Sequence, residues 1–287
     1  MSETWSIIVH GGAGLIKPER REAKRAATLA AVQAGAVVLA AGGTAVEAVV
    51  AAVRLMEDDP HFNAGFGAVL NADRRVELDS ALMDGATLDL GGVAAVQGVK
   101  NPIEVAHLML RDEPVLLAGD GARRYAAEKG AAMIDPEAMI APHRRTDDVA
   151  DTVGCVVFDV EGNFAAGTST GGRPGKRPGR IGDSPIPGAG LYAQNGVGAV
   201  SLSGEGELIL RRILGARLVA DLETTDAATA ADRAIGAMGG QGGVGCIVLG
   251  ADGGPAFAHN APDFAVAMEQ AGKPARAFLN RGEWQGD

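Results

Sequence analysis

Two apolar segments joined by a very short turn constrain the fold of this chain more than any other feature. Residues 152–160 alternate apolar and other positions, residues 163–169 follow almost at once, and Glu161-Gly162-Asn163 form the connection. Strands joined so closely can pair only antiparallel, because a parallel pair needs a crossover of a dozen or more residues. The sequence therefore predicts a β-hairpin near mid-chain and argues against a doubly wound parallel sheet.

Both strands and helices are expected before and after this hairpin. Further strands are expected near 6–9, 91–99, 197–203, 244–249 and 255–259, and residues 63–78 alternate like paired strands. Helices are expected near 18–41, 44–56, 101–111, 119–129, 206–220 and 224–238, with a capping box formed by Thr44 and Glu47 at the second. This order predicts a layered α+β protein with antiparallel sheet.

Residues 130–151 are interpreted as a linker. They contain Pro136, Pro142, a basic run at 143–145 and an acidic pair at 147–148. The stretch ends at Asp151, and Thr152 begins the first strand of the hairpin. Cleavage between these two residues would leave the expected strands intact.

Composition limits the classes of partner and compartment. The chain has 287 residues and a formal net charge of −10, which argues against binding to a phosphate backbone, so no nucleic acid is expected. The first residues do not resemble a signal peptide, and the longest apolar run is too short to span a membrane, so we expect a cytoplasmic protein. Cys155 and Cys246 are expected to be buried free thiols.

Thr152 is the candidate nucleophile. A threonine hydroxyl within a chain is a poor nucleophile, but a free α-amino group on the same residue supplies a general base with a pKa of roughly 7.7–8.0. The motif Asp151-Thr152-Val153-Gly154 alone is more simply read as part of a strand. Its position after the linker favours the nucleophile, and the hairpin would place Thr170 beside it, although the hydroxyls near Thr170 could equally form a local turn.

A basic loop at residues 173–185 is the candidate binding site for an amino-acid head group. Basic runs are usually solvated surface, but the glycines and prolines here exclude a charged helical face. Arg180 offers a fork for a carboxylate and Asp183 an acceptor for an ammonium group. Together with the intervening Ile181 and Gly182, they predict recognition of a free amino acid.

A third candidate is the strand-to-helix turn at Ser203-Gly204-Glu205-Gly206. Such a turn can be a plain helix cap, or it can expose N–H groups that bind an anion. In the functional interpretation, the Ser203 hydroxyl and the Gly204 N–H form an oxyanion hole, and Glu205 and Gly206 contact the substrate.

Several other chemistries are disfavoured. The sequence has no dinucleotide-binding or P-loop glycine pattern, no zinc spacing among its histidines and cysteines, and no Gly-x-Ser-x-Gly motif. Cys155 lies within an alternating strand, where an inert thiol is usual. No cofactor is expected for catalysis.

Eight short segments together resemble the isoaspartyl peptidase/L-asparaginase family, the plant-type asparaginases among the N-terminal-nucleophile hydrolases. They are residues 10–14, 62–67, 77–79, 83–85, 151–154, 168–172, 179–185 and 204–207. Each segment is weak alone, but in this order they are highly specific and extend over most of the chain.

The resemblance implies a single domain over residues 1–287 folded as a four-layer αββα sandwich. It also implies self-cleavage into an α subunit, 1–151, and a β subunit, 152–287, which assemble as a homodimer of αβ units. By the family motifs Thr152 is the nucleophile and Thr170 its hydroxyl partner. Arg180 and Asp183 hold the head group, and the oxyanion pair is Ser203 and Gly204.

The resemblance further implies a structural sodium ion in some members, held by a loop that corresponds here to residues 56–67. The candidate residues are Met56, Glu57, Phe62, Asn63 and Phe66. Two departures are visible: the family usually has threonine where this chain has Ser203, and the linker before Thr152 is shorter than usual.

The expected reaction is hydrolysis of L-asparagine or of β-aspartyl (isoaspartyl) dipeptides to L-aspartate through a β-aspartyl ester on Thr152. Which of the two small-molecule substrates is preferred stays open at this point. One alternative is a glycosylasparaginase, which residues 182–190 also resemble. The other is a non-catalytic amino-acid-binding module that retains Arg180 and Asp183 and is never cleaved.

Overall fold

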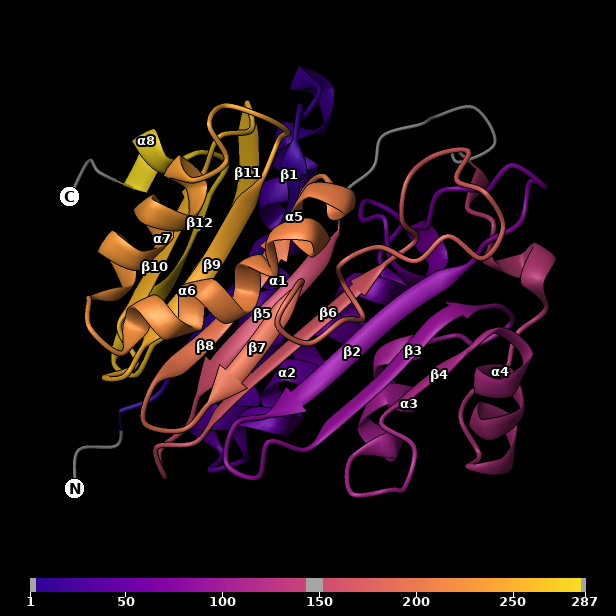
Figure 1. The fold of residues 1–287 in the computed structure, drawn as a ribbon, viewed down its shortest axis with the longest axis horizontal. Helices are drawn as coiled ribbons and strands as arrows, with labels where there is room; N and C mark the ends of the chain where they lie inside the picture. Colours follow the sequence, from indigo (N-terminus) through magenta and orange to yellow (C-terminus); the bar gives the residue numbers. More distant parts are fainter. Residues whose placement is uncertain (1–3, 143–151, 285–287) are drawn as a thin grey trace.

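The predicted hairpin forms the middle of a large sheet. The computed structural model describes residues 4–142 and 152–284. In it, β5 (Val153–Phe158) pairs antiparallel with β6 (Phe164–Thr170), and Val153 lies opposite Ser169. This pair lies between β1 (Ser6–Gly14) and β2 (Leu78–Asp84) (Figure 1). The predicted antiparallel hairpin is confirmed.

Two sheets are present in the described chain. The eight-stranded sheet has the order β12 (Lys273–Phe278), β11 (Asp263–Gln270), β1, β5, β6, β2, β3 (Leu90–Val96) and β4 (Leu116–Ala118). The four-stranded sheet has the order β10 (Pro255–His259), β9 (Gly245–Gly250), β8 (Gly198–Ser203) and β7 (Leu191–Gln194). Of the pairs described, only β3 with β4 is parallel. The sequence patterns did not reveal β2, β4, β7, β11 and β12; β4 and β7 span three and four residues, too few for an alternation to register.

The helices follow the predicted order with adjusted ends. They are α1 (Arg21–Ala40), α2 (Ala45–Asp58), α3 (Pro102–Met109), α4 (Gly119–Glu128), α5 (Gly206–Arg212), α6 (Leu214–Leu222), α7 (Ala227–Gly236) and α8 (Arg281–Trp284). The capping box at α2 is confirmed, because Glu47 N donates to Thr44 Oγ1 at 3.2 Å and Thr44 N donates to Glu47 Oε2 at 2.9 Å. Both free cysteines are buried, as expected.

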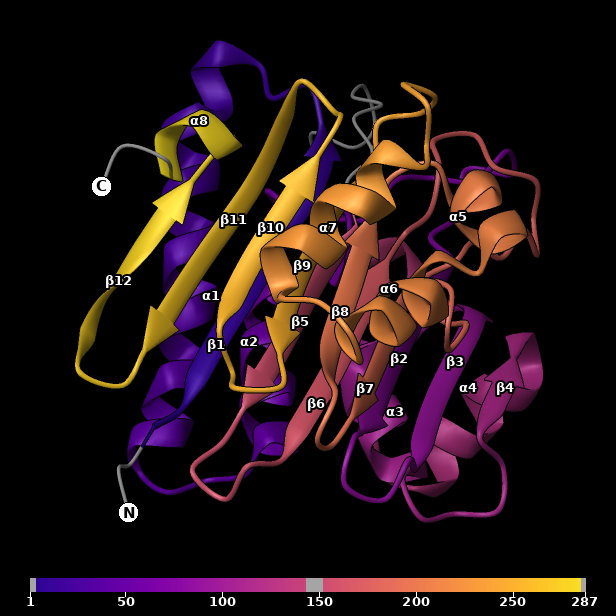
Figure 2. The ribbon, with the colours of Figure 1, turned by 60° about the vertical axis from the view of Figure 1, so that its left-hand side comes forward.

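Apolar side chains join helices and sheets on several faces. Val32 and Val53 belong to the core between α1, α2 and one face of the large sheet. Val156 and Phe164 point from the opposite face toward the four-stranded sheet. The outer face of that second sheet is covered by α6 and α7 (Figure 2). The mixed α+β class predicted from the sequence is confirmed.

Two predicted elements were wrong. Residues 206–220 form two helices instead of one, because Ile213 adopts a left-handed conformation with φ of 47° and interrupts the helix. Residues 63–77 form a loop with a 3-10 turn at Gly65–Gly67, and the strand begins only at Leu78. In this loop the Asn71 side chain accepts the N–H of Asp73 and of Arg75, so backbone groups are satisfied locally instead of in a ladder.

The first helix is long and rich in apolar residues. Residues Pro18–Ala40 form one helical stretch of 23 residues that, by length and composition alone, is apolar enough to cross a membrane. The sequence criterion of an unbroken apolar run did not register it. In the structure α1 packs against α2, β1 and β11, and its buried positions fall on that side. This packing is that of a core helix.

The linker is only partly described. Residues 130–142 contain a bridge between Val99 and Met133 and a 3-10 turn at Pro136–Met139, so this part is attached to the domain. Residues 143–151, including the expected cleavage position Asp151, lie outside the described residues.

Candidate active site

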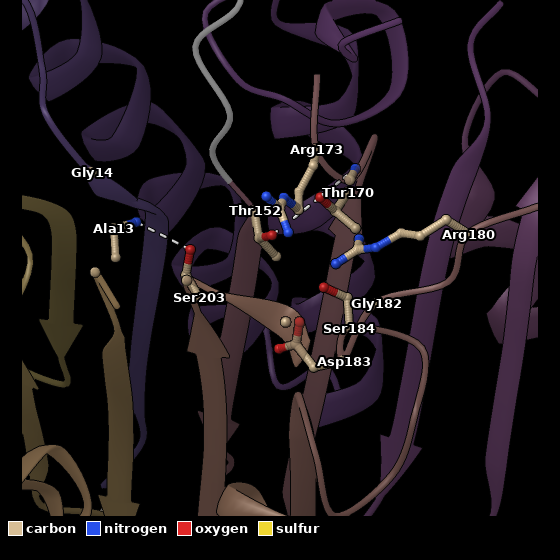
Figure 3. Close-up of a pocket in the computed structure, with 14 residues that line it drawn as sticks. Ala13, Gly14, Thr152, Thr170, Arg173, Arg180, Gly182, Asp183, Ser184 and Ser203 are labelled. Carbon is tan, nitrogen blue, oxygen red and sulfur yellow. Dashed lines mark hydrogen bonds between the residues drawn. The ribbon is translucent and has the colours of Figure 1, made fainter. Parts of the chain in front are cut away.

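The candidate nucleophile lies at one edge of the large sheet, next to its expected partner. Thr152 directly precedes β5 and Thr170 ends β6, so the antiparallel pairing brings the two together. The Thr152 Oγ1 hydroxyl donates to Thr170 Oγ1 at 3.1 Å (Figure 3). Thr170 Oγ1 also accepts the Gly172 N–H at 3.0 Å. The second contact fixes the Thr170 side chain where it can hold the Thr152 hydroxyl.

A pocket of about 280 Å³ opens in front of these two hydroxyl groups. The sequence candidates that line it are Thr152, Thr170, Arg180, Gly182, Asp183, Ser203, Gly204 and Gly206. Ile181 and Glu205 are not among the described lining residues; both are exposed. Residues from three distant segments therefore meet in one small cavity.

Arg180 is held by an acidic partner. Its Nε donates to Glu207 Oε1 at 3.0 Å and its Nη2 donates to Glu207 Oε2 at 2.9 Å. The Arg180 hydrogen bonds are the main cause that lowers the pKa of Glu207 to about 2, so Glu207 is ionised at neutral pH. This paired geometry uses one edge of the guanidinium and directs the group toward the pocket.

Asp183 lies at the base of the pocket. It is buried, and within the described chain its Oδ2 has no hydrogen-bond partner. Burial raises the pKa of Asp183 to about 7, although the nearby Arg180 cation acts in the opposite direction. A Cβ at Gly206 would lie 2.8 Å from Asp183 Oδ1 and 3.0 Å from Arg180 Nη2. Only glycine leaves room for both charged groups at that point.

Ser203 ends β8 and Gly204 follows it, and both line the pocket together with Thr152. Ser203 Oγ accepts the Ala13 N–H at 3.0 Å, which leaves the hydroxyl hydrogen available to a ligand. Gly204 has a φ of 141°, and a Cβ there would lie 2.3 Å from the Gly243 carbonyl oxygen. The position therefore requires glycine, and Gly204 lines the pocket.

A buried histidine lies behind the nucleophile. His10 on β1 pairs with Gly154, and its Nε2 is 2.9 Å from Ser201 Oγ. Burial lowers the pKa of His10 to about 3, so the ring is neutral, and the backbone of Thr152 lies close enough to oppose this shift. His10 does not line the pocket. Among the described lining residues, no histidine or lysine is available as a general base for Thr152.

The loop that carries Arg180 is anchored by a second acidic residue. Gly179 N donates to Glu77 Oε2 at 3.0 Å, and the buried Lys176 Nζ donates to the Glu77 carbonyl oxygen at 3.1 Å. The basic loop is thus only partly solvated surface. One of its cations, Lys176, is an internal anchor, while Arg173 and Arg180 reach the pocket.

The candidate sodium loop packs against the turn after β6. Met56, Glu57, Phe62 and Asn63 are buried and Phe66 is partly buried. Asn63 Nδ2 donates to the Gly172 carbonyl oxygen at 2.7 Å, and the Asn63 carbonyl oxygen accepts the Gly171 N–H at 2.9 Å. Through these two bonds the loop holds the turn that follows Thr170.

Several residues of the site were not singled out from the sequence. Ala13, Arg173 and Gly243 line the pocket, and Glu207 orients Arg180. A signal for Glu207 existed, because an acidic residue in the first turn after Gly204 could meet the basic loop. Ala13 and Gly243 carry no polar side chain, so nothing in their type indicated that their backbones would reach this pocket.

Comparisons with known proteins identify similar sequences over most of the chain. The family model described as asparaginase matches residues 3–149 and 141–278. An isoaspartyl peptidase/L-asparaginase of Danio rerio is 41% identical over 230 residues, covering 74% of each chain. An isoaspartyl peptidase of Escherichia coli (strain K12) is 37% identical over 300 residues, covering 93% of each chain. A plant-type L-asparaginase of Pyrobaculum calidifontis is 42% identical, covering 80% of this chain and 84% of its own.

Fold and pocket together define an α+β protein that places a threonine hydroxyl beside charged side chains in one pocket. With the family model matching most of its length, the chain belongs to the asparaginase family.

Proposed function

We propose that this chain is a self-processed threonine amidohydrolase that converts β-aspartyl dipeptides and L-asparagine to L-aspartate. The observation that carries the proposal is the 3.1 Å contact between Thr152 and Thr170 at a pocket that also holds Arg180 and Asp183. The relatives described above are isoaspartyl peptidases and asparaginases, so they favour this function over a glycosylasparaginase or a binding module.

In the proposed reaction Arg180 binds the substrate α-carboxylate and Asp183 its α-ammonium group. Cleavage between Asp151 and Thr152 gives Thr152 a free amine, and this amine takes the hydroxyl proton as the oxygen attacks the β-carbonyl carbon. The Ser203 hydroxyl and the Gly204 N–H stabilise the oxyanion. The Thr152 ammonium gives this proton to the leaving nitrogen as the amide C–N bond breaks, which leaves a β-aspartyl ester that water then hydrolyses to L-aspartate.

The amine is the base that this site favours. The described pocket wall offers no histidine or lysine, and His10 is neutral and bonded to Ser201. An α-amine with a pKa of roughly 7.7–8.0 is suited to proton transfer at neutral pH. Processing before Thr152 would therefore supply the group that the unprocessed chain lacks in this pocket.

The same proposal includes the finer features of the family. The packing of helices and sheets supports a four-layer αββα sandwich within one domain, residues 1–287, cleaved into 1–151 and 152–287. We also propose a homodimer of αβ units in the cytoplasm, with no cofactor in catalysis; size-exclusion chromatography with light scattering tests the dimer.

A structural sodium ion in the loop at residues 56–67 is also proposed. A Cβ at Gly65 would lie 2.3 Å from the Glu57 carbonyl oxygen, and one at Gly67 would lie 2.1 Å from that of Phe62. Main-chain oxygens thus face into a tight loop, and oxygen atoms are the ligands that hard cations take. The ion would hold the loop and hence the turn after Thr170. A higher melting temperature in sodium than in tetramethylammonium buffer is expected.

N-terminal sequencing of the purified protein tests the core of the proposal. A second N-terminus of Thr-Val-Gly-Cys is expected, together with release of aspartate from β-aspartyl-leucine. Thr152→Ala should give an uncleaved chain without activity. Full activity of Thr152→Ala, or an uncleaved and active wild-type chain, would disprove the mechanism.

A further inference from the structure

The pocket lining carries two arginines, whereas L-asparagine has one carboxylate. Among the described lining residues, Arg173, Arg180 and Asp183 are the charged ones, and Glu207, just outside this lining, binds both arginines. An aspartyl head group brings one carboxylate and one ammonium, which match Arg180 and Asp183. Arg173 is left without a counterpart on that ligand.

Arg173 lies at the mouth of the pocket. Its side chain is 59% exposed, whereas that of Arg180 is 17% exposed and Asp183 is buried. Figure 3 shows Arg173 and Arg180 both reaching toward the space in front of Thr152 and Thr170. The head-group residues therefore form the deep part of the site, and Arg173 lies where a substrate would extend outward from it.

Arg173 is only lightly held. Its Nη1 is 3.4 Å from Glu207 Oε2, and that same oxygen already accepts a 2.9 Å bond from Arg180 Nη2. An exposed ion pair of this kind contributes little to stability. The guanidinium of Arg173 can therefore turn to a ligand, while Arg180 keeps its two bonds to Glu207.

A pocket of about 280 Å³ is small, so it suits the aspartyl part of a dipeptide and leaves the second residue at the mouth. In a β-aspartyl dipeptide that second residue carries its own α-carboxylate. The ligand then has two carboxylates and one ammonium, which complement Arg173, Arg180 and Asp183 of the pocket lining.

We propose that Arg173 binds the carboxylate of the leaving amino acid and so makes β-aspartyl dipeptides the preferred substrate over L-asparagine. This inference rests on the proposed function, and it assigns the leaving-group side of the same site. Arg173 contributes to the binding of the leaving residue and takes no part in the proton transfers at Thr152.

Three substrates separate this role from others: β-aspartyl-leucine, its C-terminal amide β-aspartyl-leucinamide, and L-asparagine. The amide keeps the scissile bond and the leucine side chain but lacks the second carboxylate. Processed wild type is compared with Arg173→Gln and with Arg177→Gln. Arg177 is an exposed arginine of the same loop that does not line the pocket, so its variant controls for loss of one positive charge.

For Arg173→Gln we expect kcat/KM on β-aspartyl-leucine to fall about tenfold, the size of one partly exposed charge-assisted contact. Its kcat/KM on the amide and on L-asparagine should stay within about twofold of wild type. Arg177→Gln should match wild type on all three substrates.

Other outcomes would overturn the proposal in distinct ways. Equal losses on all three substrates would mean that Arg173 acts on the head group through Glu207. No change on β-aspartyl-leucine would mean that Arg173 does not contact the leaving residue. If processed wild type hydrolyses none of the three substrates, the proposed function itself fails. The comparison of Arg173→Gln with wild type tests only the role of Arg173.

Discussion

Arg180 donates two parallel hydrogen bonds to Glu207, from Nε to Oε1 at 3.0 Å and from Nη2 to Oε2 at 2.9 Å. The two residues come from different parts of the chain, a loop without regular structure and the first turn of α5 (Gly206–Arg212). A carboxylate that binds an arginine in this forked geometry restricts the plane of the guanidinium group. Glu207 therefore fixes the orientation of the Arg180 guanidinium at the pocket.

The first prediction concerns this pair. Glu207→Gln keeps the size of the side chain but loses the charge and one of the two acceptor oxygens. We expect KM to rise about tenfold for both L-asparagine and β-aspartyl-leucine, with kcat changed by less than about twofold, because the pair positions a binding group. Steady-state kinetics of the processed variant measure this. A fall in kcat at unchanged KM would assign Glu207 to the chemical step instead.

The second prediction concerns the hydroxyl pair. Thr170→Val removes the acceptor that holds the Thr152 hydroxyl at 3.1 Å, while the side-chain shape is kept. We expect kcat to fall roughly 10²-fold with little change in KM, because the nucleophile loses its orientation. Thr170→Ser keeps the hydroxyl and is the matched control, expected within about fivefold of wild type. Similar losses in both variants would indicate a packing role for Thr170.

The third prediction is a pH dependence of binding. Burial raises the pKa of Asp183 to about 7, and an ammonium ligand needs the carboxylate form. The affinity for the product L-aspartate should therefore weaken as the pH falls through 7. Succinate, which lacks the ammonium group, should not show this component. Calorimetric titrations of both ligands between about pH 5.5 and 8.5 test it, because this range brackets the pKa of Asp183. Identical pH profiles for the two ligands would contradict the assignment.

The fourth prediction concerns stability. Glu57 is fully buried, its carboxyl group accepts the Ile103 N–H at 3.0 Å, and burial raises its pKa to about 8 from an ordinary value of 4.5. The folded state therefore retains a proton that the unfolded chain loses. The resulting stabilisation is complete below about pH 4.5 and is lost as the pH rises toward 8.

Glu57→Gln lacks this titration. In sodium-free buffer the melting temperature of wild type relative to Glu57→Gln should fall by about 3 °C or more between pH 5 and 8. Differential scanning calorimetry at several pH values measures the difference. A difference that is constant with pH would mean that Glu57 keeps one protonation state in the fold.

Local patterns were reliable where the structure depends on neighbours in sequence. The β5–β6 hairpin follows from its short turn, and the α2 cap follows from Thr44 and Glu47. The single helix predicted over residues 206–220 failed because one residue, Ile213, takes a left-handed conformation that its type does not favour. The strands expected within 63–77 failed because asparagine side chains satisfy that loop's backbone.

The residues of the candidate site also fall into those that the sequence could identify and those that it could not. Thr152, Thr170, Arg180, Asp183, Ser203 and Gly204 could be selected by residue type and motif, and the fold brings them to one pocket. Arg173 was visible only as part of a basic run, with nothing to distinguish it from Arg177. Exposure and position relative to the pocket make that distinction.

The sequence by itself determined which side chains are available: a threonine that follows a predicted linker, and an arginine and an aspartate in one basic loop. Only the tertiary structure decided the protonation states and the orientations of these side chains. Pairing with Glu207 fixes Arg180, and burial raises the pKa of Asp183. The weakly paired guanidinium of Arg173 lines the pocket and is largely exposed. Such effects depend on distance and desolvation between segments far apart in the chain, which no local pattern encodes.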